Sequence, residues 1–291
     1  MSYTDTNSFK ENKMINKTKI DHVGIICTDL DKVTDLFSAL GFVFGSKNTL
    51  DSGLKNEKTP TNLHFVFDNA YIECIQTTGD DYLSPYLQAP AGLNIVVFSA
   101  TNIEQSRQQL LNIGYDVSPA VIAKRNADHG AKKGTAIFNW IKIENHAINH
   151  VLLGAVNHET KELIYQKERY IHPNSVNKIK SLVLYDETGE LEQEIQRISD
   201  ALIDDNDLGI PELRSVNKET IKNELGLQEK EANLLTKSVQ NRAFIAVVFT
   251  DFDRETLIHK CTEQGLSYFI HEKKIILDLS LTIGLFFIFE E

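Results

Sequence analysis

The feature that most constrains the fold is an order of elements that occurs more than once along the chain. A β-strand is expected over residues 19–26 and a helix over residues 30–40, which Gly41 ends. Three strand-like runs follow the helix, at residues 42–45, 63–67 and 70–77. The first unit of the chain is therefore predicted to be a βαβββ module.

The same order follows a second time. A strand is expected over residues 93–99, and a helix over residues 103–113 ends at Gly114. Three further strands are expected, at residues 115–122, 135–143 and 147–155. A repeated supersecondary unit predicts two similar modules that pack side by side.

The C-terminal half shows a weaker form of this order. Strands at residues 179–185 and 243–250 each precede a helix, and these helices are expected at residues 190–203 and 254–264. Two last strands are expected at residues 274–278 and 284–290. Residues 204–238 fit the pattern badly, with a short helix expected near residues 218–224 and a strand near residues 233–238. The third module is therefore degenerate or carries an insertion.

Composition narrows the class of protein. The chain has 291 residues, of which 42% are hydrophobic, and this length favours two domains. Its net charge of −11 argues against a nucleic-acid surface, which needs a positive face. No apolar run is long enough to span a membrane, and the N-terminus lacks an apolar signal core. The three cysteines lie in or beside apolar runs without CxxC spacing, so we expect reduced core residues in a cytoplasmic protein.

The paired modules imply a ligand site. Two βαβββ units side by side close the concave faces of their sheets into a cup, and polar residues inside its strands need an explanation. His22 lies within the first strand and Glu73 within the fourth. Imidazole and carboxylate together suit Zn²⁺, Fe²⁺, Mn²⁺ or Ni²⁺. The alternative from residue types is that His22 and Glu73 hydrogen-bond each other across the sheet, or face solvent.

The residues of the first module resemble a known family. The segments that carry the resemblance are IDHVGIICTDLDKVTDLFSALGF, TPTNLHFVF and AYIECIQ. They look like the opening module of the glyoxalase-like domain family, within the vicinal oxygen chelate superfamily. The resemblance implies an α+β fold in which βαβββ modules pair into open mixed β-barrels. In the superfamily's metalloenzymes the first strand supplies a His or Gln and the last strand a Glu, and His22 and Glu73 resemble those positions.

Composition, the order of elements and the resemblance together divide the chain. Residues 1–18 are expected to be a disordered N-terminal extension, and residues 19–155 a glyoxalase-like domain of two modules. Residues 156–176 are expected to be a connector, and residues 177–291 a degenerate second glyoxalase-like domain. The C-terminal pair is expected to pack against the first, to cap the cavity or to form a homodimer.

Departures from the family pattern concern the remaining ligands, which the resemblance places on the first and last strands of the second module. The matching position in its first strand is Asn94, a poor ligand for a transition metal. The last strand offers Asn149 and His150, which point to opposite faces. If His150 points inward, His22, Glu73 and His150 form a chemically reasonable metal set; if Asn149 does, the site is a weaker polar pocket. In the second half, Ser181 stands where His22 would be.

Three side chains are candidate substrate contacts. Asn62 belongs to the resembling segment TPTN, and Asn94 stands at the ligand position of the second module. Arg125 lies in the basic stretch Lys124–Gly134, which we interpret as a loop beside the cup. Its guanidinium could hold an anionic substrate, and the alternative is a solvated hairpin loop.

Two functions remain open at this point. The first is a metal-dependent lyase, isomerase or dioxygenase acting on a small oxygenated substrate, with a divalent metal (Zn, Fe, Mn or Ni) held by His22, Glu73 and His150. Glu73 would double as the catalytic base. The second is a non-catalytic protein that binds a small molecule, such as an antibiotic or a metabolite, and Asn94 in place of a ligand supports it.

Overall fold

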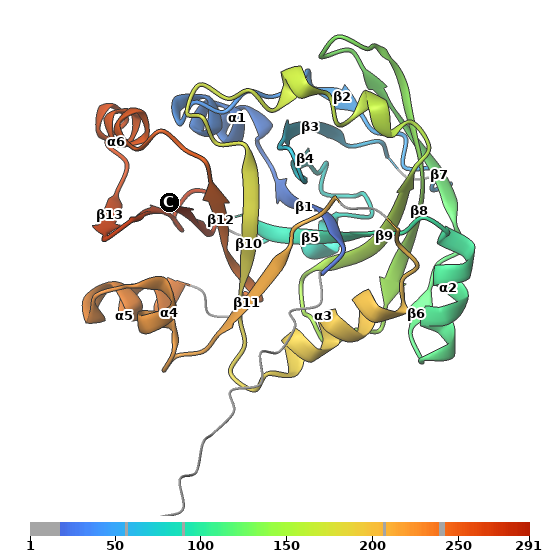
Figure 1. Ribbon diagram of the computed structural model, residues 1–291. Coiled ribbons are helices and arrows are strands. Elements are labelled where there is room, and N and C mark those ends of the chain that lie inside the picture. The colour runs from blue at the N-terminus through green and yellow to red at the C-terminus, as the bar shows by residue number, and fades with distance from the viewer. Residues whose placement is uncertain (1–17, 56–57, 89–90, 206–207, 239–241) are drawn as a thin grey trace, which may run out of the picture.

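Two mixed β-sheets dominate the computed structural model, which describes residues 18–55, 58–88, 91–205, 208–238 and 242–291 (Figure 1). The first module comprises β1 (Ile20–Cys27), α1 (Leu30–Ala39), β2 (Asn48–Thr49), β3 (Thr61–Val66) and β4 (Tyr71–Gln76). The second comprises β5 (Gly92–Ser99), α2 (Ile103–Asn112), β6 (Asp116–Val117), β7 (Val121–Ala127), β8 (Gly134–Glu144) and β9 (Leu152–His158). The predicted order of elements is confirmed in both modules.

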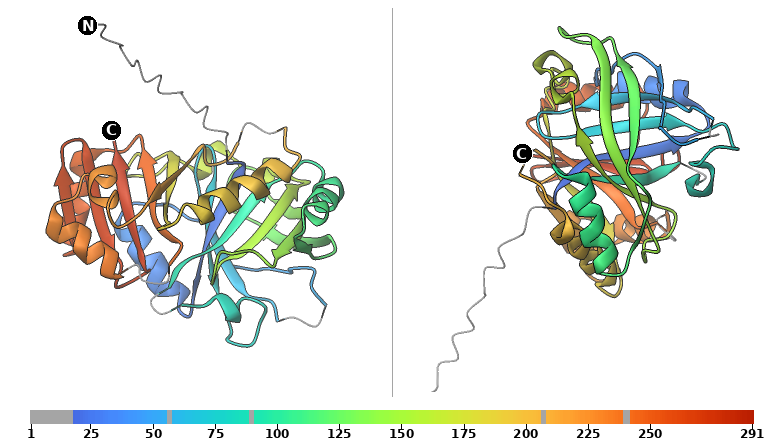
Figure 2. Two further views of the ribbon diagram at one scale, coloured as in Figure 1. Left: turned by 90° about the horizontal axis from the view of Figure 1, so that it is seen from below. Right: turned by 90° about the vertical axis from the view of Figure 1, so that its right-hand side faces the viewer.

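These two modules form one sheet. Its strands follow the order β2-β3-β4-β1-β5-β9-β8-β6, and β7 pairs with β8. The first strands of the two modules, β1 and β5, run antiparallel at its centre, with Val23 opposite Val96. The sheet is curved and does not close into a barrel (Figure 2). Its concave face lines a cavity, which we call the cup.

The two faces of this sheet bury different side chains, as alternation along a strand requires. Val23, Ile25 and Val96 belong to the main core, which also contains Leu30 and Phe37 of α1. Ile95 and Val97 point the other way and belong to a smaller apolar cluster in the cup. Helix α1 begins where the side chain of Asp29 caps it, and Asn102 caps α2 in the same way.

The C-terminal half forms a second sheet with the order β11-β10-β12-β15-β14-β13. Its third module comprises β10 (Lys178–Tyr185), α3 (Glu190–Ala201), β11 (Glu212–Val216), α4 (Ile221–Leu225) and α5 (Glu229–Ser238). The fourth comprises β12 (Phe244–Thr250), α6 (Arg254–Glu263), β13 (Tyr268–His271), β14 (Lys274–Leu279) and β15 (Leu285–Glu290). No helix in the described part of the chain is long and apolar enough to cross a bilayer.

Helices α4 and α5 cover one face of the second sheet (Figure 1). Ile221, Leu225 and Leu235 pack there against strand residues such as Val183 and Ile288. This face corresponds to the cup face of the first sheet, so the second cup is filled with protein. The strand predicted at residues 233–238 is wrong, because α5 runs through these residues, whereas the short helix predicted near residues 218–224 is present as α4.

The two sheets share one core. Phe37 of α1 contacts Phe287 of β15 with ring centroids 5.4 Å apart, and Phe42 lies 5.7 Å from Phe249 of β12. In the connector, the ring of His172 accepts a hydrogen bond from the backbone N–H of Val43 at 2.9 Å and contacts the carbonyl of Val66 at 3.0 Å. The connector is therefore fixed to the first module.

Some predicted boundaries need correction. No strand forms over residues 42–45, and the strand predicted over residues 115–122 is divided between β6 and β7. The strand predicted from residue 147 begins only at Leu152, because residues 145–151 form a loop. Residues 1–17 of the predicted disordered extension lie outside the described residues, but Thr18 is buried and donates a hydrogen bond to the carbonyl of Ile210. The three cysteines are free and buried, as expected.

Candidate functional site

The cup of the first sheet encloses a cavity of about 560 Å³, including the part open to solvent. One wall is apolar and comes mostly from the second module. It consists of Ile95, Val97, Phe138, Trp140, Leu152 and Val156. The polar lining comes from His22, His64, Tyr71 and Glu73 of the first module and Arg125 of β7. We call the part of the cup that these five side chains line its polar end; Ser52 and Tyr82 line the cup as well.

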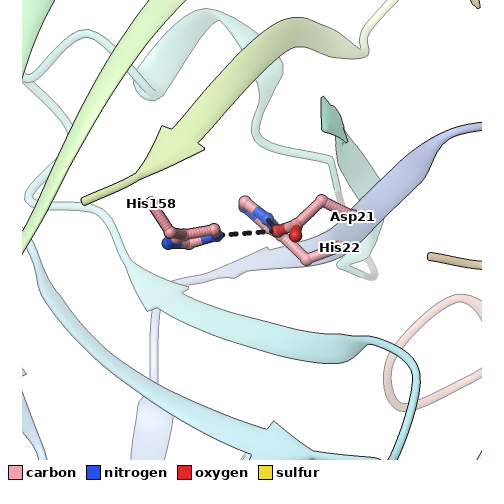
Figure 3. Close-up of side chains that lie close together, drawn as sticks. All are labelled: Asp21, His22 and His158. Carbon is pink, nitrogen blue, oxygen red and sulfur yellow. Dashed lines mark hydrogen bonds and ion pairs between the residues drawn. The ribbon is translucent and has the colours of Figure 1, made fainter. Parts of the chain in front are cut away.

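A buried carboxylate lies behind His22 (Figure 3). Oδ2 of Asp21 lies 2.7 Å from Nδ1 of His22 and 3.0 Å from Nε2 of His158, at the end of β9. Oδ1 of Asp21 accepts a hydrogen bond from the hydroxyl of Tyr165 at 3.1 Å. Burial alone would raise the pKa of Asp21, but the neighbouring His158 and His22 lower it well below its ordinary value. Asp21 is therefore an ionised carboxylate.

This contact fixes the tautomer of His22. An ionised carboxylate only accepts hydrogen bonds, so the nitrogen facing it, Nδ1, carries the proton. The imidazole of His22 also stacks on the ring of Tyr71, with centroids 4.2 Å apart and an interplanar angle of 13°. Nε2 has no hydrogen-bond partner among the described residues, and it belongs to a ring that lines the cup.

Asp21 reaches the interior because β1 is irregular at this point. The register between β1 and β5 shifts between Ile20 and His22, so Asp21 is an extra residue on its strand. A bulge of this kind re-aims side chains, and two consecutive residues here reach the same interior network.

A second polar group surrounds Glu73. Its Oε1 accepts a hydrogen bond from Nδ2 of Asn62 at 2.6 Å and lies 3.3 Å from Nε2 of His64. Burial and the nearby Arg125 lower the pKa of His64 to about 3, so this imidazole is neutral and donates through Nε2–H. Burial raises the pKa of Glu73, but the contacts with His64 and Asn62 outweigh it and lower the pKa to about 2. The pair is therefore an ionised carboxylate with a neutral donor.

Arg125 lies on β7, a strand, and not in the loop that the sequence predicted. Its side chain points into the cup, and its residue is only 5% exposed. Nη2 has no hydrogen-bond partner in the described part of the chain. An unpaired buried cation is costly, so a group that completes its hydrogen bonds is expected.

The other predicted site residues lie elsewhere. His150 lies on an exposed turn before β9 with a φ of 57°, in a different hollow that Asn149 also lines. Asn94 is fully buried at a second register shift between β1 and β5, where it accepts from the N–H of Ile26 and donates to the carbonyl of Tyr86. The structure therefore does not bring either residue together with His22 and Glu73. Ile95 and Val97 are the residues of β5 that line the cup, and neither offers a ligand atom.

The residues present do not fit the predicted metal site. Among the described residues, only Asp21, His22 and His158 bring three potential ligand atoms within 4.8 Å of one another. Those atoms already form hydrogen bonds with each other, and Asp21 and His158 do not line the cup. The wall of the second module, where further ligands were expected, is apolar. We therefore derive no chemistry through a metal.

Four residues of the site escaped the sequence analysis. Alternation along a strand placed Asp21 on the opposite face from His22, and only a bulge reverses this. His158 and Arg169 belong to the segment that was predicted to be a connector, and Tyr71 lies in the resembling segment AYIECIQ, where only Glu73 was singled out. A signal was available for Asp21, since a charged residue within an apolar strand indicates a buried partner.

Comparisons with known proteins agree with this architecture. Residues 20–198 match a family described as a glyoxalase-like domain. The fold is similar to a hypothetical protein from Staphylococcus aureus, with a TM-score of 0.55 and 11% identity over 93% of this chain and 98% of the other. It is also similar to a mutant 4-hydroxymandelate synthase from Streptomyces coelicolor, with a TM-score of 0.52 and 9% identity over 94% and 92% of the two chains.

No curated protein matches the sequence. The two structural similarities, at 11% and 9% identity, show the fold alone. The family match covers more than half of the chain and agrees with the paired βαβββ modules around the cup. The chain therefore belongs to the glyoxalase-like domain family.

Proposed function

We propose that this protein is an isomerase that transfers a proton on a small oxygenated molecule bound in the cup of the first sheet. The substrate carries a carbonyl group, and the transferred proton comes from the carbon beside it. The observation that carries the proposal is the buried Asp21, which holds His22 with a free Nε2 at the wall of the cup. A carboxylate behind an imidazole is the arrangement of a general base.

His22 is a better base than Glu73. The low pKa of Glu73, about 2, makes its carboxylate a weak proton acceptor, whereas a general base works best when its pKa lies near the operating pH. Histidine is the side chain most often used for this purpose. We therefore assign the base to His22, and to Glu73 the role of a fixed negative charge that positions donors.

The proton transfer uses residues of this chain only. Nε2 of His22 takes the proton from the carbon, and Asp21 stabilises the imidazolium that forms. The electron pair left on the carbon moves onto the carbonyl oxygen. Tyr71 is a suitable donor to that oxygen, because burial and the charges of Asp21 and Glu73 raise the pKa of its hydroxyl and keep it protonated. When the deprotonated carbon carries a hydroxyl group, His22 returns the proton to the former carbonyl carbon. The hydroxyl proton passes to the former carbonyl oxygen, which completes the isomerisation.

A second candidate is a binding protein without turnover. The apolar wall of the second module favours it, since Ile95, Val97 and Leu152 contribute surface for a ligand and no reactive group. The two candidates differ in whether His22 exchanges protons with the bound molecule.

Proton exchange in heavy water tests the proposal. The protein is incubated with small 2-oxo acids, 2-hydroxy acids and 2-hydroxy aldehydes, and proton NMR follows the loss of the signal beside the carbonyl. We expect exchange with at least one compound, and a rate at least about 100-fold lower in His22→Asn. The matched control is His259→Asn, which changes an exposed histidine of α6 and should leave the rate unchanged. Saturable binding without exchange, or full exchange in His22→Asn, would contradict the proposal.

A further inference from the structure

A small hollow, about 190 Å³ when the part open to solvent is included, adjoins the polar end of the cup. It shares His64 and Arg125 with the cup, and Gly45, Asp128 and Arg169 also line it. Arg125 comes from β7, and Arg169 comes from the short 3₁₀ helix η3 (Lys167–Arg169) of the connector. Two segments distant in the sequence thus place guanidinium groups at one point.

Both arginines are buried with part of their hydrogen-bonding capacity unused. Arg125 is 5% exposed and Arg169 is 4% exposed. Nη1 of Arg169 donates to the carbonyls of Leu163 and Ile164, each at 3.1 Å. Nη2 of Arg125 and Nε of Arg169 are buried and have no partner in the described residues. Each unpaired buried N–H costs free energy, and acceptor oxygens between the two groups would remove that cost.

The charges around the hollow are also unbalanced. Asp128 is the acidic residue that lines it, and one Oδ atom of Asp128 is likewise buried without a partner. Glu73 is engaged by Asn62 and His64 on the side of the cup. Burial and the positive charge of Arg125 lower the pKa of Arg169 to about 10, which shows that the two cations act on each other. Two guanidinium groups with one carboxylate leave the hollow with an excess of positive charge.

Gly45 keeps the hollow open. A Cβ atom at this position would lie 3.3 Å from Nη2 of Arg169 and 3.7 Å from Cβ of His129. A side chain here would occupy the space beside the guanidinium group without changing any charge.

We propose that this hollow is a subsite for an anionic oxygen group, a carboxylate or a phosphate, held between Arg125 and Arg169. A forked guanidinium group suits both anions. The inference rests on the proposed function only in one respect: the anion and the carbon that His22 deprotonates belong to one substrate molecule. The substrate class is then a small carbonyl compound with an acidic group at one end.

Equilibrium binding of simple anions to the full chain tests the subsite without turnover. Isothermal titration calorimetry with inorganic phosphate and with acetate, at constant ionic strength, should show saturable binding of at least one. Tighter binding of phosphate indicates a phosphate ester as substrate, and tighter binding of acetate indicates a carboxylate. Arg125→Gln and Arg169→Gln should each weaken binding at least about tenfold. The exposed neighbours Lys124→Gln and Lys167→Gln are matched controls and should bind as the wild type does.

Two further variants make the result decisive. Gly45→Ala keeps every charge and should also weaken binding, so a folding defect in Arg169→Gln would not leave the subsite unsupported. His22→Asn should bind the anions as the wild type does, so loss of proton exchange and loss of the subsite are separate results. No binding of either anion, or binding that neither arginine variant nor Gly45→Ala weakens, would overturn the inference.

Discussion

Single residues set how this protein responds to acid. His172 is buried, and its ring lies between the N–H of Val43 and the carbonyl of Val66, a position that suits a neutral imidazole with one donor and one acceptor. Burial lowers its pKa from 6.5 to about 4, although the contact with Val66 opposes the shift. In the unfolded chain, His172 takes up a proton at a higher pH than in the folded protein.

This difference predicts a loss of stability in mild acid. Because the pKa of His172 is lower in the folded protein, the neutral imidazole contributes stability that is fully present above pH 6.5. As the pH falls from 6.5 towards 4, the free energy of unfolding should decrease by about 3 kcal/mol. Glutamine offers the same donor and acceptor without titrating. The free energy of unfolding of His172→Gln should therefore decrease less as the pH falls from 6.5 to 4. Urea unfolding at several pH values measures the effect, with the exposed His259→Gln as the control. Equal pH profiles for the wild type and His172→Gln would contradict this account.

Residue types predicted part of the site. His22, Glu73 and Arg125 were recognisable because polar or charged residues in apolar or acidic surroundings need partners, and all three line the cup. The assignment of His150 depended on where a strand begins, and an error of five residues in that boundary moved it from a strand to an exposed turn. Asp21 depended on a bulge, which follows from the pairing of β1 with β5 and not from either strand alone.

At the scale of elements, the second sheet has no open cup in the described part of the chain because α4 and α5 cover the corresponding face. The chain after β11 folds onto the face that corresponds to the cup face of the first sheet, and it buries apolar side chains there. Gly226 ends α4 with a φ of 68°, a conformation that glycine adopts without strain. The next segment can therefore turn back as α5 over the same face.

Shortening an apolar side chain that α4 or α5 buries against the second sheet should destabilise the protein. Leu225 is fully buried between α4 and the second sheet, so Leu225→Ala should lower the free energy of unfolding by about 2–5 kcal/mol. Chemical denaturation measures the change. Lys230→Ala, an exposed substitution on α5, should change it by less than about 0.5 kcal/mol. Similar values for the two variants would show that α4 does not fill the second cup as described.

Elements were predictable where the hydrophobic pattern was regular. The four helices α1, α2, α3 and α6 follow apolar spacing, and their starts agree with the prediction. Strand β11 was missed because it lies at the edge of the sheet and carries Glu212 and Arg214, whose charges resemble those of a loop. Helix α5 was read as a strand because a short apolar run does not distinguish the two; its partners on the second sheet decide the conformation.

Four related modules and one open cup make up the part of the molecule that the structure describes. The bulge that turns Asp21 into the interior has a counterpart in β10, where the register with β12 shifts between Ile179 and Ser181. The extra residue there is Lys180, which forms an ion pair with Glu290 at 2.7 Å. Arg214 and Lys274 also contact Glu290, so this carboxylate balances charges of the second sheet. The same irregularity therefore serves the site in one half and an ion-pair network in the other.

The second half contributes to function through packing. Phenylalanines of β12 and β15 contact Phe37 and Phe42 of the first module, so the second sheet supports the outer face of the first. The opposite face of the first sheet stays open as the cup. A rigid sheet with a hydrogen-bonded His22 is what positioning of a general base requires.

The central claim is that Asp21 holds His22 with its proton on Nδ1 and a free Nε2 in the cup. Long-range proton–nitrogen NMR spectra of protein labelled in its histidines measure this directly, and His22→Asn identifies the signal. We expect the Asp21-facing nitrogen Nδ1 of His22 to be the preferred protonation site, and we expect this preference to be lost in Asp21→Asn. A proton on Nε2 in the wild-type protein, or a tautomer unchanged by Asp21→Asn, would contradict it.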